Sequence, residues 1–251
     1  MTTTRLARST IAALAGAIVT LAQLNLPSKP FWDGLSALLY ISVVTVALFV
    51  VYEAVLSCDQ ALQVRRIREY ETTMAHALSA AVRLVVEEFG VAWDQVAVYH
   101  YQSRWTWRGK RLGRVTAVRA GAPVTEAPLR LRLGQGVPGS AFMTQELIAE
   151  EWRDFAQQAV IAGRAAWDAR PSDQRYGLNW GELNNSERPE GQVSNPQFDN
   201  AGKPVGCTVV SGPLKPADLT SQQMRRILSD LATTMKQTGP APRGWWTYCD
   251  R

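Results

Sequence analysis

The side chains that most often do chemistry in proteins are few in this chain and far apart. The sequence has two histidines, His76 and His100, and three cysteines, Cys58, Cys207 and Cys249. None of them has a companion at the spacing of a metal site or of a nucleophile–histidine–carboxylate triad. The odd, widely spaced cysteines favour a reducing compartment over a disulfide framework. We therefore predict no metal site, no catalytic residue and no enzyme activity.

Positive charge gathers in one central stretch. Between Arg104 and Arg132 there are eight basic residues and one acidic residue, interleaved with Trp105 and Trp107. Such a stretch can contact anionic lipid, bind nucleotide or nucleic acid through phosphate contacts and stacking, or form the solvated face of a hairpin. We assign a candidate contact with an anionic surface to five of these residues: Arg104, Arg108, Lys110, Arg111 and Arg114. The net charge of +5 names no partner by itself, and we do not expect nucleic acid.

A run of glycines precedes a predicted helix that begins near Ser140. Gly134, Gly136 and Gly139 could cradle a phosphate, but a dinucleotide fingerprint needs a preceding parallel strand and an acidic residue about twenty positions later. The surrounding strands read as antiparallel. We prefer a structural turn, with glycine for its permissive dihedral angles and Pro138 for rigidity.

The longest apolar run predicts a membrane span over residues 35–56. Nineteen residues from Gly34 to Tyr52 pass without a charge. A helix rises about 1.5 Å per residue, so roughly twenty apolar residues cross a hydrocarbon core of about 30 Å. The alternative is a buried helix of a soluble protein, which usually shows a polar face.

An earlier apolar run, over about residues 10–26, is predicted as a first span. The alternative is a signal peptide, because Arg5 and Arg8 precede an apolar core of suitable length. Pro27 and Pro30 favour a tight reversal into the second span, so residues 1–58 form a two-helix hairpin. Basic residues on both flanks place both ends of the chain in the cytoplasm, as a two-pass protein of the cell inner membrane.

A connecting helix without glycine or proline is predicted over residues 59–89. Apolar residues at seam spacing favour a homodimeric coiled coil. These are Ile67, Tyr70, Met74, Ala77, Ala81 and Leu84. The alternative is a single amphipathic helix packed on one core.

The remaining chain alternates predicted strands and turns. Strands are expected at 96–102, 113–119, 129–133 and 202–211, with a basic loop between the first two. Asp218 is expected to cap a last amphipathic helix. Residues 90–238 then form one domain, and residues 239–251 form an aromatic tail.

Taken together, this region resembles a GAF domain, the sensor fold related to PAS. The resemblance depends on the lead helix, the LGQGVPGSAF stretch at 133–142, the NPQFDNAGKPVGCTVV stretch at 195–210 and the closing helix. It implies an α+β fold in which an antiparallel sheet of about six strands is flanked by helices. The first and last helices would cover one face, and a ligand pocket would lie on the other.

The resemblance also implies where a ligand binds. In GAF domains the region after the glycine turn lines the pocket, so the candidate pocket residues are the aromatic ones between Thr144 and Gln192. These are Trp152, Phe155, Trp167, Tyr176 and Trp180. The alternative is that they simply cover the sheet. Haem at His100 or a chromophore at Cys207 would follow only by family analogy, the signature for cyclic nucleotides is missing, and no cofactor is named.

These elements predict a membrane-anchored sensor. A small ligand or a signalling protein would bind the GAF-like domain, and the helix would relay its state to the spans or to a partner. The alternative is a ligand-triggered effector that disrupts the membrane, by architectural analogy with two-span, nucleotide-signalled bacterial defence proteins.

Overall fold

The computed structural model describes residues 2–24, 26, 28–120, 130–186 and 188–242, with side chains from Thr10 onward. The chain divides into two compact units, Met1–Arg66 and Ile67–Arg251, and one helix, α3 (Ser36–Phe89), contributes to both. Most of the predicted tail, from residue 243, and the side chains of Arg5 and Arg8 lie outside the described part.

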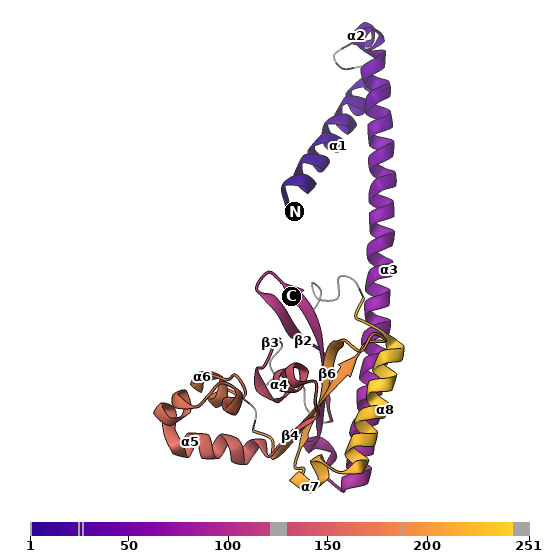
Figure 1. Cartoon of the computed structure of the whole chain (residues 1–251). Helices are drawn as coiled ribbons and strands as arrows, with labels where there is room; N and C mark the ends of the chain where they lie inside the picture. Colours follow the sequence, from indigo (N-terminus) through magenta and orange to yellow (C-terminus); the bar gives the residue numbers. More distant parts are fainter. Residues whose placement is uncertain (1, 25, 27, 121–129, 187, 243–251) are drawn as a thin grey trace. The chain divides into compact units, whose positions relative to one another are not determined.

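The first unit consists of α1 (Thr2–Gln23), α2 (Lys29–Gly34) and the beginning of α3 (Figure 1). In the apolar part of α3, Ile41, Leu48 and Val51 expose 64%, 65% and 61% of their surfaces. The hydroxyls of Ser42 and Thr45 donate to carbonyls one turn earlier, at 2.9 and 2.7 Å, which satisfies them inside the helix. Only 6% of the most apolar window is buried, whereas the core helix of a soluble protein would be mostly covered.

Two spans were predicted, and the described residues contain one helix long and apolar enough to cross a bilayer. That helix is α3. The apolar part of α1 covers Thr10–Gln23, which at about 1.5 Å per residue spans roughly 21 Å, short of a hydrocarbon core of about 30 Å. The two-pass hairpin is therefore not shown, and α1 alone does not supply its first span.

The second unit is built on a six-stranded antiparallel sheet in the order β3-β2-β1-β6-β5-β4. The strands are β1 (Ala97–Thr106), β2 (Gly109–Arg119), β3 (Arg130–Arg132), β4 (Ile148–Glu150), β5 (Gly191–Phe198) and β6 (Pro204–Gly212). Alternation along β1 sends Val96 and Val98 to one core cluster and Tyr99 and Tyr101 to another. The sheet is therefore covered on both faces.

Helices form the outer layers (Figure 1). The second half of α3 and α8 (Gln222–Thr238) share a core with one face of the sheet. The other helices are α4 (Gly136–Thr144), α5 (Trp152–Ala169), α6 (Trp180–Asn184) and α7 (Pro216–Leu219), with single 3-10 turns at Trp93–Gln95 and Asp173–Arg175. Of these, α5 and α6 build a small core of their own.

The predicted coiled-coil seam is covered by the chain itself. Ile67, Tyr70, Met74 and Ala81 are all at most 7% exposed and pack with α8 and the sheet. Leu84 is the exception, at 46% exposed. This half of α3 is therefore an amphipathic helix that packs on its own core, and the homodimer stays a prediction.

Three local predictions are corrected. The predicted basic loop between residues 102 and 113 is mostly strand, because β1 and β2 continue to a turn at Trp107 and Arg108. The helix predicted near Ser140 begins at Gly136. Ser221, and not Asp218, caps α8, because its hydroxyl accepts the Met224 N–H at 3.1 Å while Asp218 caps the short α7.

Candidate functional site

A small cavity lies on the sheet face that the GAF resemblance assigns to the ligand. Its volume is about 80 Å³. Tyr99 and Tyr101 of β1 form part of its wall, with Leu131 of β3, Val137 of α4 and Trp152 of α5. A cavity of this size holds a few water-sized groups, well below the several hundred Å³ typical of ligand sites.

The predicted pocket aromatics mostly pack against one another. Of the five, Trp152 lines the small cavity. Its ring stacks on Phe155 at 5.3 Å between centroids, and Phe155 meets Tyr176 edge-on at 5.2 Å. Trp167 is fully buried and Trp180 packs at the side of the same core. These residues therefore build the core of α5 and α6, with Trp152 alone at the cavity wall.

Two polar contacts hold this helical region in place. The Trp167 indole N–H donates to the Leu178 carbonyl at 3.3 Å. The Tyr176 hydroxyl donates to the Glu150 carboxylate. Burial raises the pKa of the Tyr176 phenol, and its hydrogen bond with Glu150 and the charge of Glu150 raise it further, so this hydroxyl stays protonated.

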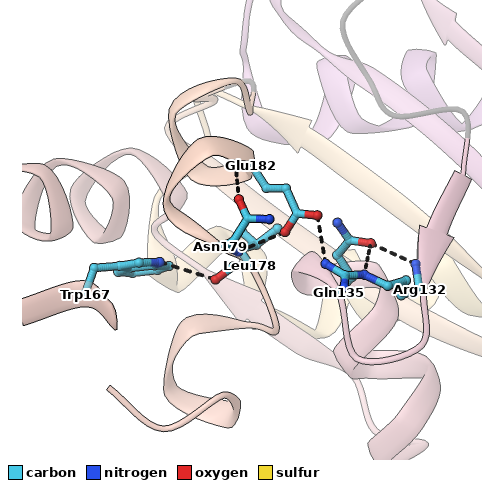
Figure 2. A network of polar contacts seen from close by, with 6 residues as sticks. All are labelled: Arg132, Gln135, Trp167, Leu178, Asn179 and Glu182. Carbon is cyan, nitrogen blue, oxygen red and sulfur yellow. Dashed lines mark hydrogen bonds and ion pairs between the residues drawn. The ribbon is translucent and has the colours of Figure 1, made fainter. Parts of the chain in front are cut away.

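A polar network fastens α6 to the glycine turn (Figure 2). Arg132 forms an ion pair with Glu182 at 2.8 Å, and the Gln135 amide oxygen accepts the Arg132 N–H at 2.8 Å. Glu182 also accepts the Asn179 N–H at 2.8 Å, within the capping box of α6. The segment over the small cavity is thus connected to the turn that precedes α4.

The backbone amides of the glycine turn are already in use. The N–H of Gly134 donates to Gly139 at 3.0 Å, and that of Gly136 to Tyr176 at 2.8 Å. A Cβ on Gly139 would lie 2.8 Å from the Arg132 carbonyl. This geometry agrees with the preferred prediction of a structural turn, because the amides that would hold a phosphate face protein carbonyls.

A larger groove opens on the α8 side of the sheet, where sequence reasoning placed no site. Its volume is about 820 Å³. The sheet contributes His100 and Gln102 from β1 and Asn195 and Gln197 from β5. The last three turns of α8 form the opposite wall, together with residues 239 and 240. Its size is that of a typical small-molecule site.

The floor of this groove is a buried polar layer. His100 is 1% exposed, Gln197 is 6% exposed, and the Gln197 amide donates to the Thr208 hydroxyl at 2.5 Å. Burial lowers the pKa of His100 to about 4, although a hydrogen bond with the Cys207 backbone acts in the opposite direction. His100 is therefore a neutral imidazole at pH 7, and its Nδ1 has no hydrogen-bond partner among the described residues.

Charged side chains border the same groove. Arg225 and Lys236 come from α8, and Asp199 comes from the turn after β5. Asp199 is occupied locally, because one carboxylate oxygen accepts the N–H groups of Ala201 and Lys203, each at 2.8 Å. With two cations and one carboxylate, the border of the groove carries a formal charge of +1.

In the sequence analysis, strand β5 contributed only to the fold resemblance, and its polar side chains were not recognised as candidate ligand contacts. Alternation along β5 puts Val193, Asn195 and Gln197 on the face that packs on α3 and α8, so two amide side chains occupy core-facing positions after a valine. Polar residues at core-facing positions of a strand were the signal available in the sequence.

The cysteine that lies in the sheet is chemically protected. Cys207 points to the opposite face from His100 and is fully buried, and burial raises the pKa of its thiol to about 12. Within the described part of the chain, no group of three or more His, Cys, Asp or Glu residues could hold a metal ion.

The five residues of the predicted anionic-surface contact all lie on the β1–β2 hairpin. Arg108 lies in the turn itself, with its guanidinium 4.2 Å from the Trp107 ring centroid. The Lys110 ammonium lies 5.0 Å from the ring of Phe142 on α4, so it contacts its own domain. Arg104 and Arg111 face each other directly across the ribbon, and Arg114 lies further along β2.

Comparison with known proteins gives a resemblance of fold. No family model and no curated protein matches the sequence. The chain is similar to the GAF domain of an Acinetobacter phosphoenolpyruvate-protein phosphotransferase, at 16% identity and a TM-score of 0.39, covering 70% of this chain and 92% of that one. It is also similar to the type II free methionine-R-sulfoxide reductase of Thermoplasma acidophilum, at 14% identity and a TM-score of 0.40, covering 67% and 94%. The Neisseria meningitidis reductase, solved with its substrate, shares 17% identity over 71% and 88%, with a TM-score of 0.39.

The reductases correct one prediction. They are enzymes among the solved structures of similar fold, so the prediction of no enzyme activity is corrected to this extent: the fold includes enzymes. The missing metal and triad spacings are no ground for excluding catalysis in this fold. The six-stranded antiparallel sheet, with its first and last helices on one face, is nevertheless the arrangement that the sequence resemblance predicts. The second unit therefore has a GAF-like α+β fold.

Proposed function

We propose that this protein is a membrane-anchored sensor whose GAF-like domain binds a small ligand in the groove between α8 and the sheet. The observation that carries the proposal is a groove of about 820 Å³ with His100 in its floor, 1% exposed and with an unpartnered Nδ1. A buried polar atom without a partner costs free energy, which a bound ligand recovers.

The lining indicates the class of ligand. Asn195 and the neutral His100 offer both donors and acceptors, which suit an uncharged ring or an amide, whereas the Gln102 amide oxygen already accepts the Ala241 N–H at 3.1 Å. Arg225 and Lys236, which lie eleven residues apart on α8, give this wall of the groove a positive charge and favour an anionic ligand. We therefore propose a small organic anion with hydrogen-bonding groups on its body.

The same groove offers a route to α3. Helix α8 forms one wall of the groove through its polar side, and its apolar side shares a core with α3. A ligand that shifts α8 would act on α3 through residues such as Met74 and Leu228. We propose that α3 anchors the chain in a membrane and relays this state, either to its own apolar part or to a partner protein.

Small molecules that co-purify with the full-length chain in detergent test the ligand site. Ala232 lines the groove, so Ala232→Phe should fill it, whereas Thr234→Phe, two positions further along α8, is a matched control outside the lining. We expect mass spectrometry to find one compound near stoichiometry with the wild type and with Thr234→Phe, and much less with Ala232→Phe. Equal amounts in all three proteins, or none in the wild type, would contradict the groove as the site.

A further inference from the structure

The β1–β2 hairpin ends in two tryptophans that the protein leaves uncovered. Trp105 is 81% exposed and Trp107 is 87% exposed. A two-residue turn at Trp107 and Arg108 closes the hairpin, with Gly109 in the left-handed region at φ 97° and the Thr106 hydroxyl donating to the Gly109 carbonyl at 2.7 Å. The tip is therefore an ordered turn that presents large rings to its surroundings. Two neighbouring exposed indoles are unusual for a surface that meets only water.

The hairpin carries charge of one sign. Between residues 97 and 119 there are six basic residues and no acidic residue. The register places Arg104 directly opposite Arg111, and Arg111 directly opposite Arg132. Like charges opposite each other destabilise a sheet. Arg132 is compensated by its ion pair with Glu182, and the ribbon from residue 97 to residue 119 contains no acidic residue. An external anionic surface would lower the mutual repulsion of the basic residues on the ribbon.

We propose that the hairpin tip docks on an anionic lipid bilayer, with Trp105 and Trp107 in the interfacial layer and Arg108 and Arg111 on the lipid headgroups. Indole rings prefer the membrane interface because they combine an apolar body with a polar N–H. Basic residues beside them add attraction to anionic lipid. The bilayer is favoured over a nucleic acid because the chain also carries α3, whose apolar part would hold the domain near a membrane at a high effective concentration.

This inference rests on the proposed anchoring by α3 but not on the ligand. The full-length chain is reconstituted into nanodiscs of phosphatidylcholine, with or without phosphatidylserine. A fluorophore sensitive to polarity is attached at Trp107→Cys, in a background with Cys58→Ser and Cys249→Ser. Cys207 needs no replacement, since it is buried. Ile161→Cys is the matched control, because Ile161 is an apolar residue that is 78% exposed and lies on α5, away from the hairpin.

We expect a blue shift and a gain in emission at position 107 when phosphatidylserine is present, and no change at position 161. The pair Arg108→Glu and Arg111→Glu should abolish the shift. The pair Arg164→Glu and Arg226→Glu, with the same change in net charge on α5 and α8, should retain it.

Each other result overturns a defined part of the proposal. A label at position 107 that stays water-like in incorporated chains, or that shifts equally without phosphatidylserine, rules out anionic docking. A shift with a single-stranded oligonucleotide in place of anionic lipid assigns the hairpin to nucleic acid instead. If the chains do not enter nanodiscs at all, the proposed anchoring by α3 is contradicted, and the docking proposal that rests on it is contradicted as well.

Discussion

His100 is the buried polar residue at which one face of the sheet changes from apolar to polar. Along β1, apolar residues on the α8 side give way to His100 and Gln102, and the sheet face becomes polar where the groove begins. The imidazole is neutral because burial disfavours its charged form. A neutral ring can both donate and accept a hydrogen bond, which suits ligand recognition better than a buried cation would.

This histidine should make the domain sensitive to acid. Its pKa is about 4 in the folded state and about 6.5 when unfolded, so the unfolded chain binds the proton first and stability falls as pH decreases between these values. The loss should reach about 3 kcal/mol at pH 4. Melting temperatures of the wild type and of His100→Gln, from pH 7 to pH 4, measure it. The variant should lose less stability over this window, and parallel pH profiles would contradict the buried neutral state.

Cys207 should be unreactive in the folded protein. A pKa near 12 leaves about one thiolate in ten thousand at pH 8, and the side chain is fully buried. In a Cys249→Ser background we expect maleimide to modify the exposed Cys58 and to spare Cys207 until denaturant is added. Mass spectrometry of the labelled peptides measures this. Rapid labelling of Cys207 in the native state would show that the sheet opens or that the thiol is accessible.

At the scale of elements, the segment from β3 to α6 depends on backbone contacts that leave no room for side chains. Gly177, at φ 58°, follows the 3-10 turn at Asp173–Arg175, and a Cβ there would collide with the Gly134 carbonyl. The glycine turn and the α5–α6 region are thus packed backbone against backbone, next to the polar network of Arg132 and Glu182.

Two glycines with positive φ allow the cost of backbone strain to be measured apart from the cost of a steric collision at Cβ. Gly202, at φ 72°, has open space where its Cβ would lie, so Gly202→Ala should cost only about 1 kcal/mol of backbone strain. Gly177→Ala adds the collision and should cost clearly more, on the order of 3 kcal/mol. Thermal unfolding of both variants gives the comparison. Equal losses would mean that the turn moves to make room for the methyl group.

Helix α3 offers a similar contrast between core and surface. Met74 is 1% exposed in the shared core, so Met74→Ala should cost about 2–5 kcal/mol. Leu84, a member of the predicted seam, is 46% exposed, and Leu84→Ala should change stability by less than about 1 kcal/mol. Melting temperatures measured at two protein concentrations would test this. A large, concentration-dependent loss for Leu84→Ala would support the dimer that the sequence predicted.

At the scale of the whole molecule, the chain combines an apolar helix with a folded, water-facing domain. The apolar part of α3 leaves Ile41, Leu48 and Val51 more than half exposed, and the hydroxyls of Ser42 and Thr45 are satisfied within the helix. Water would hydrate this surface at a high cost in free energy, whereas a bilayer would not. The proposed anchoring by α3 therefore accounts for an exposed apolar helix in the same chain as a folded domain.

Charge placed in this helix should release the protein from membranes. Leu48→Arg with Val51→Arg puts two cations into the apolar part of α3, at about 2.5–3.5 kcal/mol each near the centre of a bilayer. We expect the wild type in carbonate-washed membranes and the variant in the aqueous fraction or degraded. Val160→Arg with Ile161→Arg, at exposed apolar positions of α5, is the control and should remain in the membrane fraction. Wild-type protein in the aqueous fraction without detergent would contradict anchoring.

Much of this architecture could be predicted because helices and strands follow from short-range patterns of apolar and polar residues in the sequence. Uncharged length predicts the apolar part of α3, period-two alternation predicts β1 and β3, and the 3.6-residue period predicts α8 within a few residues, although not its cap. These signals need no knowledge of distant contacts. The GAF resemblance added the order of the elements, and hence the layers.

The site could not be read in the same way, because a groove is made by residues that are far apart in sequence. His100, Asn195 and Arg225 meet only when β1, β5 and α8 are assembled, and no short motif contains them. The predicted aromatics illustrate the converse: apart from Trp152 they pack in the core of α5 and α6, because large rings fill cores wherever helices meet, and their role in binding a ligand stays a prediction. Residue types and their spacing therefore determined which elements form, whereas the packing of those elements decided which side chains border empty space, because burial is a property of the assembled molecule.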